Sequence, residues 1–582
     1  MTEPYRTDAG GTVYRNIPDA AGFNAFTVDD EFDALLSVYL DADLLDRVRP
    51  RFEELGALVG RELEQLALSA DRNPPVLEVR DRTSRPVDRV VKHPDYVALE
   101  RYAFGEFGLA AMSHRAGVFG EVTALPPLVK YGLVYLFVQA EFGLCCPLSM
   151  TDSLTRTLVK YGDPELIDRF FDQLTSQDLD RLHQGAMFMT EQEAGSDVGA
   201  ITTVARRGDD GTWRLWGDKW FCSNPDAELA MVLARPEGGD DGTRGLSLFL
   251  LPRHHPDGSL NARRIVRLKD KLGTRSMASG EVTLDGAVAY LVGDPGQGFK
   301  QMTDMMNMSR LANGVRSAGM MRRSVNEARF ITANRRAFGR PLAELPLMRR
   351  QVAKLETAAE EGRAMVFHTA EVLRRADAGD ADMARVLRIL TPLIKFRTCR
   401  DARKVTGDLM EIRGGVGYIE EWSDARMVRD AHLGSIWEGT SNIVALDVAR
   451  ATRREGALDA LTAYLHLLLD EPGVDRDLRA ALAPLVDRAA GFMSSVAGDR
   501  DAEIDVRRAA GAVYHATAAV FLAWEDGRVT TVAPQLAGRR ARWARAVIDH
   551  KLTAPDPLAP TGSAGPVPMA GGAPTDRLQL PS

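Results

Sequence analysis

A single glutamate, Glu438, has sequence neighbours that suit a catalytic base. The run Ser435-Ile436-Trp437-Glu438-Gly439-Thr440-Ser441-Asn442 places it between a large aromatic residue and a glycine. Burial beside Trp437 would raise the pKa of the carboxyl group and shield it from water, as proton removal from carbon requires. A helix N-cap at Thr440 or Ser441 would explain the residues that follow Glu438 as the start of a helix. It does not explain why a glutamate stands at position 438.

Two earlier segments could hold a planar cofactor that carries phosphates. In Phe188-Met189-Thr190-Glu191-Gln192-Glu193-Ala194-Gly195-Ser196-Asp197, a polar turn offers backbone N–H groups and hydroxyls to a phosphate or a heteroaromatic edge. In Gly217-Asp218-Lys219-Trp220-Phe221-Cys222-Ser223-Asn224, an aromatic pair precedes small thiol and hydroxyl residues that could cover one face of a ring. Taken alone, an ordinary turn and an ordinary strand explain these segments at least as well.

Two later segments combine arginines or paired glycines with a helix end. Asn334-Arg335-Arg336-Ala337-Phe338-Gly339-Arg340-Pro341-Leu342 ends a helix with arginines beside an aromatic residue, which suits a pyrophosphate or adenine contact. Glu411-Ile412-Arg413-Gly414-Gly415-Val416-Gly417-Tyr418 has paired glycines that allow close backbone approach to a ligand. Solvated surface and a simple turn are the competing explanations.

The elements that must position these segments follow an α, β, α order, with a further α unit after it. Helical spacing of apolar residues runs from Asp41 through Leu66, and the apolar run Leu128–Phe142 predicts a buried helix. Short alternating or apolar runs between glycines and prolines predict strands. They are Thr212–Gly217, Leu229–Leu233, Leu246–Leu251 and Gly280–Leu284. We expect units at 1–184, 185–295, 296–450 and 451–553, and a flexible tail at 554–582.

Composition excludes several classes of protein. The 582 residues carry a formal charge of -8, which argues against a general polyanion binder. Four cysteines occur with no metal-binding spacing, so we expect neither a metal site nor a disulfide framework, and the reducing cytoplasm fits best. The acidic N-terminus predicts no signal peptide, and no apolar stretch is long enough to predict a membrane span.

Together and in this order, the five segments resemble the acyl-CoA dehydrogenases. Thr190 through Asp197 is similar to the Thr-Glu-x-x-x-Gly-Ser-Asp loop of that family, and Lys219-Trp220 to the start of its Lys-x-Trp segment. Arg335 and Phe338 match Arg-x-x-Phe-Gly, which reaches the cofactor across a subunit interface. Glu438-Gly439-Thr440 matches the Glu-Gly-Thr that carries the base. Glu411 stands where the family usually has glutamine.

The resemblance implies a mostly α, α+β fold: an N-terminal helical domain, a middle β-barrel-like domain, a four-helix bundle and an additional C-terminal helical domain. It implies FAD as the cofactor and Glu438 as the base. It assigns FAD binding to Phe188, Met189, Thr190, Gly195, Ser196, Trp220, Phe221, Cys222, Ser223, Arg335, Phe338, Glu411, Gly414, Gly415, Ile436, Trp437, Thr440 and Asn442, and substrate contacts to Ser196, Arg310 and Gly439. Which of Cys222 and Ser223 touches the flavin stays open.

The implied reaction is α,β-dehydrogenation of an acyl-CoA thioester, with hydride transfer to flavin N5. In some branches the base precedes an arginine that resembles Arg310; here that position is Ser309, which leaves Glu438 as the family-consistent base. The resemblance also implies a homotetramer, a dimer of dimers, and an acceptor such as electron-transfer flavoprotein. An oxidase that uses oxygen stays open. A related nitroalkane-oxidising branch uses aspartate as the base, so Glu438 disfavours that reaction.

A closer similarity is to the branch linked to bacterial DNA-alkylation stress. Asn73-Pro74-Pro75, Cys146-Pro147-Leu148-Ser149-Met150 and the Ser-Ile-Trp-Glu-Gly run carry this likeness. Similarity to this branch implies an alternative function: a flavoprotein that binds or protects DNA and has weak or vestigial dehydrogenase activity. However, residues 451–550 contain 13 Arg and 14 Asp or Glu. The arginine cluster at 539–545 could bind phosphates, but we expect it to form a solvated helix face.

Overall fold

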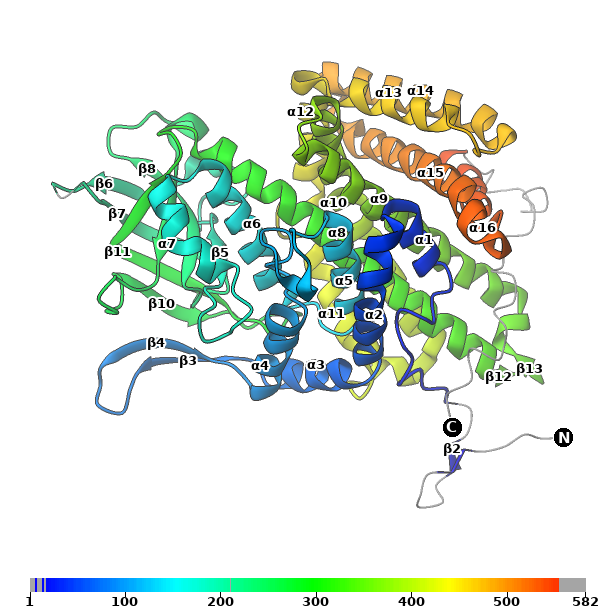
Figure 1. Cartoon of the computed structure of the whole chain (residues 1–582), viewed down its shortest axis with the longest axis horizontal. Coiled ribbons are helices and arrows are strands. Elements are labelled where there is room, and N and C mark those ends of the chain that lie inside the picture. Colours follow the sequence, from blue (N-terminus) through cyan, green and yellow to red (C-terminus); the bar gives the residue numbers. More distant parts are fainter. Residues whose placement is uncertain (1–5, 8–12, 15–16, 210, 554–582) are drawn as a thin grey trace.

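The computed structural model describes residues 6–7, 13–14, 17–209 and 211–553. The expected tail at 554–582 lies outside them. A β unit occupies one end of the molecule, a long helical bundle crosses its middle, and further helices cover one side of the bundle (Figure 1). The unit boundaries predicted from the sequence stay a prediction. Within the described residues, no helix is long and apolar enough to cross a bilayer.

The N-terminal part is helical and contains one extended hairpin. Asp41 begins the second helix by accepting hydrogen bonds from the backbone N–H groups of Asp43 and Leu44, as an N-cap does. The apolar run Leu128–Phe142 predicts one buried helix; the structure has a helix buried on all sides over Pro127–Phe137, and residues 138–142 lie in the turn that follows. The elements are α1 Phe32–Tyr39, α2 Ala42–Val59, α3 Glu62–Arg72, β3 Val76–Arg80, β4 Pro86–Val91, α4 Pro94–Glu100, α5 Pro127–Phe137, α6 Cys145–Tyr161 and α7 Pro164–Leu174.

The middle part closes into a barrel. Strand β11 pairs with β7, β7 with β6, β6 with β8, β8 with β9, and β9 again with β11. Strand β8 is buried along most of its length, as a short apolar run predicts. The predicted strand positions are confirmed. The strands are β5 Gly185–Phe188, β6 Val204–Arg207, β7 Trp213–Ser223, β8 Leu229–Pro236, β9 Ser247–Pro252, β10 Arg263–Leu268 and β11 Ser279–Val292.

Long helices follow the barrel and form the bundle. A small hairpin interrupts them at the end of the first long helix, opposite the barrel in Figure 1. The elements are α8 Gly298–Asn334, β12 Arg336–Ala337, β13 Arg340–Pro341, α9 Pro346–Asp377, α10 Ala381–Arg413, α11 Ser423–Gly434 and α12 Ser441–Glu455. The last helices are α13 Ala457–Asp470, α14 Arg476–Gly498, α15 Val506–Val532 and α16 Arg539–Val547. Their apolar side chains join the same core as the bundle.

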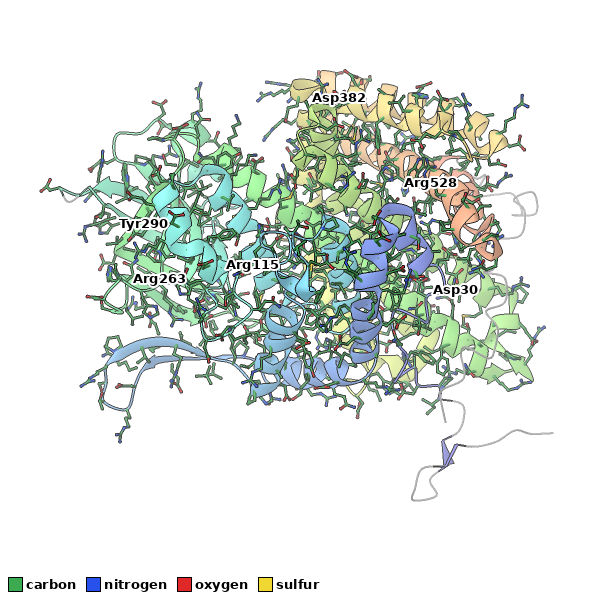
Figure 2. All side chains as sticks on the ribbon, viewed as in Figure 1. Asp30, Arg115, Arg263, Tyr290, Asp382 and Arg528 are labelled. Carbon is green, nitrogen blue, oxygen red and sulfur yellow. The ribbon has the colours of Figure 1, made fainter. Side chains whose placement is uncertain are left out.

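The arginine cluster at 539–545 is only in part the solvated helix face that the sequence suggested, because Arg545 is exposed but Arg540 is not. Arg540 is fully buried, and its guanidinium pairs with Glu31, Glu360 and Glu525. Arg539 donates to Asp30, at the place where Figure 2 shows the N-terminal segment meeting the C-terminal helices. Arg539 and Arg540 therefore dock helix α16 onto the rest of the protein. Arginines already paired with acids are poorly available to DNA phosphates, which counts against the alternative function.

Candidate functional site

Glu438 lies in the turn between α11 and α12. Its backbone has φ of 56°, and Gly439 follows with φ of 99°. A positive φ is unfavourable for a glutamate, so this turn holds strain of the kind that clusters at functional sites. Glycine relieves the strain at the next position, where a Cβ atom would lie only 3.1 Å from Val444 Cγ2. The turn therefore directs the Glu438 carboxylate inward and holds the backbone of Glu438 in an unfavourable conformation.

Two buried cations hold this turn in place. Arg310 Nε donates to the Glu438 carbonyl oxygen at 3.2 Å, and Asp447 accepts from Arg310 Nη1 at 2.6 Å. Lys395 Nζ donates to the carbonyl oxygens of Gly434 at 2.7 Å and Gly439 at 3.1 Å. Arg310 and Lys395 therefore fix the backbone on both sides of the carboxylate without occupying it.

The carboxyl group of Glu438 is free to act on a ligand. The residue as a whole is half-buried, but Oε2 is enclosed and has no hydrogen-bond partner among the described residues. Burial raises the pKa of this carboxyl, while the Ser309 hydroxyl and the positive charges of Arg310, Lys395 and Arg316 oppose the rise. A buried, unpaired carboxylate with a raised pKa has the properties of a general base.

An aromatic wall lies beside the base. The Trp437 ring stacks on Phe142, with centroids 6.1 Å apart and an angle of 18° between the rings. The guanidinium of Arg316 lies 4.7 Å from the centre of the Trp437 ring. Trp437 Nε1 is buried without a partner among the described residues. The wall therefore presents both apolar surface and an unused donor.

The loop that begins at Thr190 is clamped to strand β7. Glu191 Oε1 accepts from Lys219 Nζ at 2.7 Å, and both side chains are buried. Glu191 also binds Thr202 and Thr203, and together these contacts hold the pKa of its carboxyl at about 2. The backbone N–H of Trp220 donates to the backbone carbonyl oxygen of Thr190 at 2.8 Å. The first two sequence segments thus form one structural unit, with Gly195 and Ser196 exposed on it.

We expect Glu191→Gln to loosen this loop. The substitution leaves the buried ammonium of Lys219 without its counter-charge, and breaking such a pair costs about 3–5 kcal/mol. The variant should lose about that much stability in chemical denaturation and should retain less FAD on gel filtration. Glu193→Gln, at an exposed position of the same loop, is the control and should match the unaltered protein. Equal stability of the two variants would show that the Glu191–Lys219 ion pair does not stabilise the loop.

Strand alternation separates the two small residues after Trp220. Cys222 is fully buried in the barrel core, whereas Ser223 is partly exposed and faces Cys146, near Glu438. Lys269 Nζ lies 3.3 Å from the centre of the Trp220 ring. Phe188 also points into the barrel core, so only its backbone faces the loop. Of the pair Cys222 and Ser223, Ser223 is the one placed to meet a ligand.

The Arg335 and Gly414 segments form a second cluster, far from Glu438. Arg335 Nη1 donates to the Arg413 carbonyl oxygen at 2.6 Å, and a Cβ atom on Gly414 would lie 3.3 Å from the same nitrogen. Phe338 is 90% exposed at the tip of its hairpin. Arg335 directly follows the last residue of α8 and Arg310 lies 25 residues earlier, about 37 Å away at the rise of an α-helix. The two clusters therefore lie well apart within one copy of the chain.

Sequence reasoning missed three residues around Glu438. Lys395 and Arg316 belong to no segment singled out above, and Asp447 anchors Arg310 from helix α12. The available signal for Lys395 was a lysine placed directly among the apolar residues Leu393, Ile394 and Phe396. For Arg316 the available signal was a charged residue between small residues of α8.

Comparisons with known proteins agree with this architecture. Residues 296–452 match the model of the acyl-CoA dehydrogenase C-terminal domain, 186–287 that of the middle domain, and 16–181 that of the adaptive response protein AidB N-terminal domain. Putative acyl-CoA dehydrogenase AidB of Escherichia coli K12 is 35% identical over 453 residues, covering 75% of this chain and 80% of its own. This chain belongs to the acyl-CoA dehydrogenase family.

Three further comparisons cover most of this chain. Acyl-CoA dehydrogenase family member 11 of Caenorhabditis elegans is 34% identical over 437 residues, which cover 73% of this chain and 70% of the relative. The crystal structure of Caenorhabditis elegans ACDH-11 in complex with C11-CoA has a TM-score of 0.84 at 27% identity and covers 95% of each chain. Bd2924 in its apo-form has a TM-score of 0.79 at 30% identity, over 87% of this chain and 99% of that one.

Family membership makes the chain a flavin-dependent oxidoreductase with FAD as its cofactor. The residues present fit such a group. The Thr190 loop and Trp220 form one surface, Ser223 and the Trp437 turn lie near it, and Trp437 Nε1 is an unused donor. Ile436 and Asn442 border the same turn and are exposed.

Proposed function

We propose that the enzyme performs α,β-dehydrogenation of an acyl-CoA thioester with Glu438 as the base. The enclosed, unpaired Oε2 atom of Glu438 carries this proposal. Glu438 takes the α-proton of the bound thioester onto this oxygen. Bound FAD supplies the acceptor for the β-hydrogen, which leaves as hydride.

The backbone of the Glu438 turn lowers the barrier to proton removal. An α-proton beside a thioester is weakly acidic, so the carbonyl oxygen needs a hydrogen-bond donor as negative charge develops. We assign this role to the Glu438 N–H, which the positive φ of the turn orients. Arg310 and Lys395 act as positioning residues, since they bind the carbonyl oxygens of the turn. Ser196 and Gly439 complete the proposed substrate contacts.

We infer that the complete cofactor site needs two copies of the chain. Thr190, Trp220, Ser223 and the Trp437 turn would hold the flavin end of FAD. Arg335 and Phe338 of a second copy, with the Glu411–Gly415 segment, would hold the adenine end, because they lie at the far end of α8. A dimer of dimers and an electron-transferring flavoprotein as acceptor complete the proposal. The four cysteines are buried and free, which supports the reducing cytoplasm as the compartment.

Anaerobic flavin bleaching across a panel of acyl-CoAs tests the reaction. Bleaching reports transfer from substrate to flavin without any assumption about the physiological acceptor. We expect at least one acyl-CoA to bleach the flavin within a single turnover and to yield the 2-enoyl thioester. No bleaching with straight, branched or carboxylated acyl chains would reject the dehydrogenase assignment.

The pH dependence of bleaching follows from the raised pKa of Glu438. The base works only when ionised, so the rate falls as pH drops through a pKa that lies above the ordinary 4.5. The positive charge of Lys395 holds that pKa down. Lys395→Met should therefore move the acid limb to higher pH. Stopped-flow bleaching between pH 5 and 9 locates the acid limb in the unaltered enzyme and in the variant. An unmoved limb would mean that Lys395 does not act on Glu438 electrostatically.

A further inference from the structure

Arg316 is a fully buried arginine that forms no ion pair within the described residues. Its side chain is 1% exposed. Nε donates to the Ala312 carbonyl oxygen at 3.2 Å and Nη2 to Ser149 Oγ at 3.4 Å, while Nη1 has no hydrogen-bond partner. Burial of an unpaired charge is costly, so a buried cation normally has a counter-charge. Nothing in the described part of the chain supplies one in contact with Arg316.

Other equally buried arginines show what is missing. Arg322 pairs with Asp29 and Glu360, and Arg363 pairs with Asp29 at 2.6 Å. Arg540, described above, has three glutamates. Arg263 is likewise buried without an ion pair among the described residues, but its Nη2 donates to the carbonyl oxygens of Pro225 at 2.8 Å and Ala227 at 3.0 Å. Arg316 differs because its hydrogen bonds are longer and its guanidinium lies against Trp437, next to the base. The difference points to an anion that enters from outside the chain.

The place of Arg316 tells which ligand this anion belongs to. Ser309, Asn313 and Arg316 are spaced along one face of α8, and Ser309 lies beside the base. Asn313 is 0% exposed, and both its Nδ2 and its Oδ1 lack partners among the described residues. The guanidinium of Arg316 lies over Trp437, the residue that precedes Glu438. A line of unused polar atoms thus leads from the base into the bundle.

We propose that Arg316 determines substrate specificity by binding a carboxylate on the acyl chain. The proposal rests on the function proposed above, because the chain is placed by its α-carbon at Glu438. A guanidinium offers a planar pair of donors that matches a carboxylate, and the Asn313 amide adds another donor. An aliphatic acyl chain would leave Nη1 of Arg316 and the Asn313 amide without partners. The substrate class is the CoA monothioester of a dicarboxylic acid.

The acyl chain of this substrate is short. Ser309 and Arg316 are separated by about 10 Å along the helix axis. The Arg316 side chain also folds back toward Ala312, so its guanidinium lies nearer to Glu438 than its Cα position suggests. The carboxylate therefore sits only a few carbons beyond the α,β bond that is oxidised.

Glutaryl-CoA and pentanoyl-CoA test the proposal, because they have equal numbers of acyl carbons and differ in the terminal carboxylate. Their dissociation constants are measured by calorimetry with the FAD-loaded Glu438→Gln enzyme, because the proposed proton removal is blocked there and only binding is recorded. We expect glutaryl-CoA to bind about 10- to 100-fold more tightly. Arg316→Met should abolish this preference, and Arg316→Lys should keep part of it. Arg476→Met, at an exposed position of α14, is the control and should keep all of it.

Either of two results overturns the proposal. One is equal affinity for the two thioesters in the enzyme that retains Arg316. The other is an unchanged preference in an Arg316→Met protein that is folded, whether FAD stays bound or is lost. Loss of FAD with an unchanged preference would show that Arg316 serves the cofactor. The proposed function fails separately, by the absence of flavin bleaching with every acyl-CoA tested.

Discussion

Glu438→Gln should bind FAD normally and lose flavin bleaching by about 100- to 10,000-fold, the range that general bases contribute. The amide has the size of the carboxyl but cannot accept the α-proton. Arg310 and Lys395 bind the backbone of the turn, so they should hold it unchanged. Stopped-flow bleaching with the best substrate of the panel measures the loss, and the flavin spectrum of the purified variant measures cofactor content.

Two further variants make this result specific. Glu503→Gln makes the same change at an exposed position and should bleach at the normal rate. Glu438→Asp keeps the negative charge but moves it back by the length of one methylene group. Its bleaching rate should therefore lie between the rates of Glu438→Gln and Glu503→Gln. Bleaching by Glu438→Gln within tenfold of the normal rate would remove Glu438 from the mechanism. In that case the unpaired Oε2 would need another explanation.

Local sequence patterns predicted most of the elements correctly. The buried helix α5, the barrel strands and the N-cap at Asp41 all follow from residue spacing within one element. The segment around Glu438 was also recognisable, since its aromatic, acidic and glycine residues are adjacent in the chain. Such features need no knowledge of distant partners.

Features that depend on distant partners could not be predicted. The sequence suggested a solvated face for Arg540, because its acid Glu31 lies 509 residues away. Lys395 contacts Gly439 from a different helix. The direction of Cys222 into the barrel core depends on the register of β7 against β11, in which Cys222 pairs with Gly280. Tertiary contacts decide which charged side chains are surface and which are structural.

Arg540→Met should destabilise the protein by about 3–5 kcal/mol, because it leaves buried acids without their counter-charge. Arg540 Nε donates to Glu525 Oε2 at 2.6 Å, and Nη1 reaches Glu31 at 3.1 Å and Glu360 at 3.0 Å. These partners come from three different parts of the chain. Chemical denaturation should show the loss, and hydrogen exchange should show early opening of α15 and α16.

Arg545→Met is the matched control on the same helix. Arg545 pairs with Asp475 at 3.2 Å, but its side chain is 54% exposed, so the substitution should cost less than about 1 kcal/mol. Equal stability of the two variants would contradict the docking role of Arg540.

Gel shifts with duplex DNA complete the comparison. If Arg540→Met weakened salt-sensitive DNA binding while stability stayed normal, the cluster would be a phosphate-binding surface after all. We expect the opposite, since a guanidinium enclosed by three carboxylates has no free face for a phosphate.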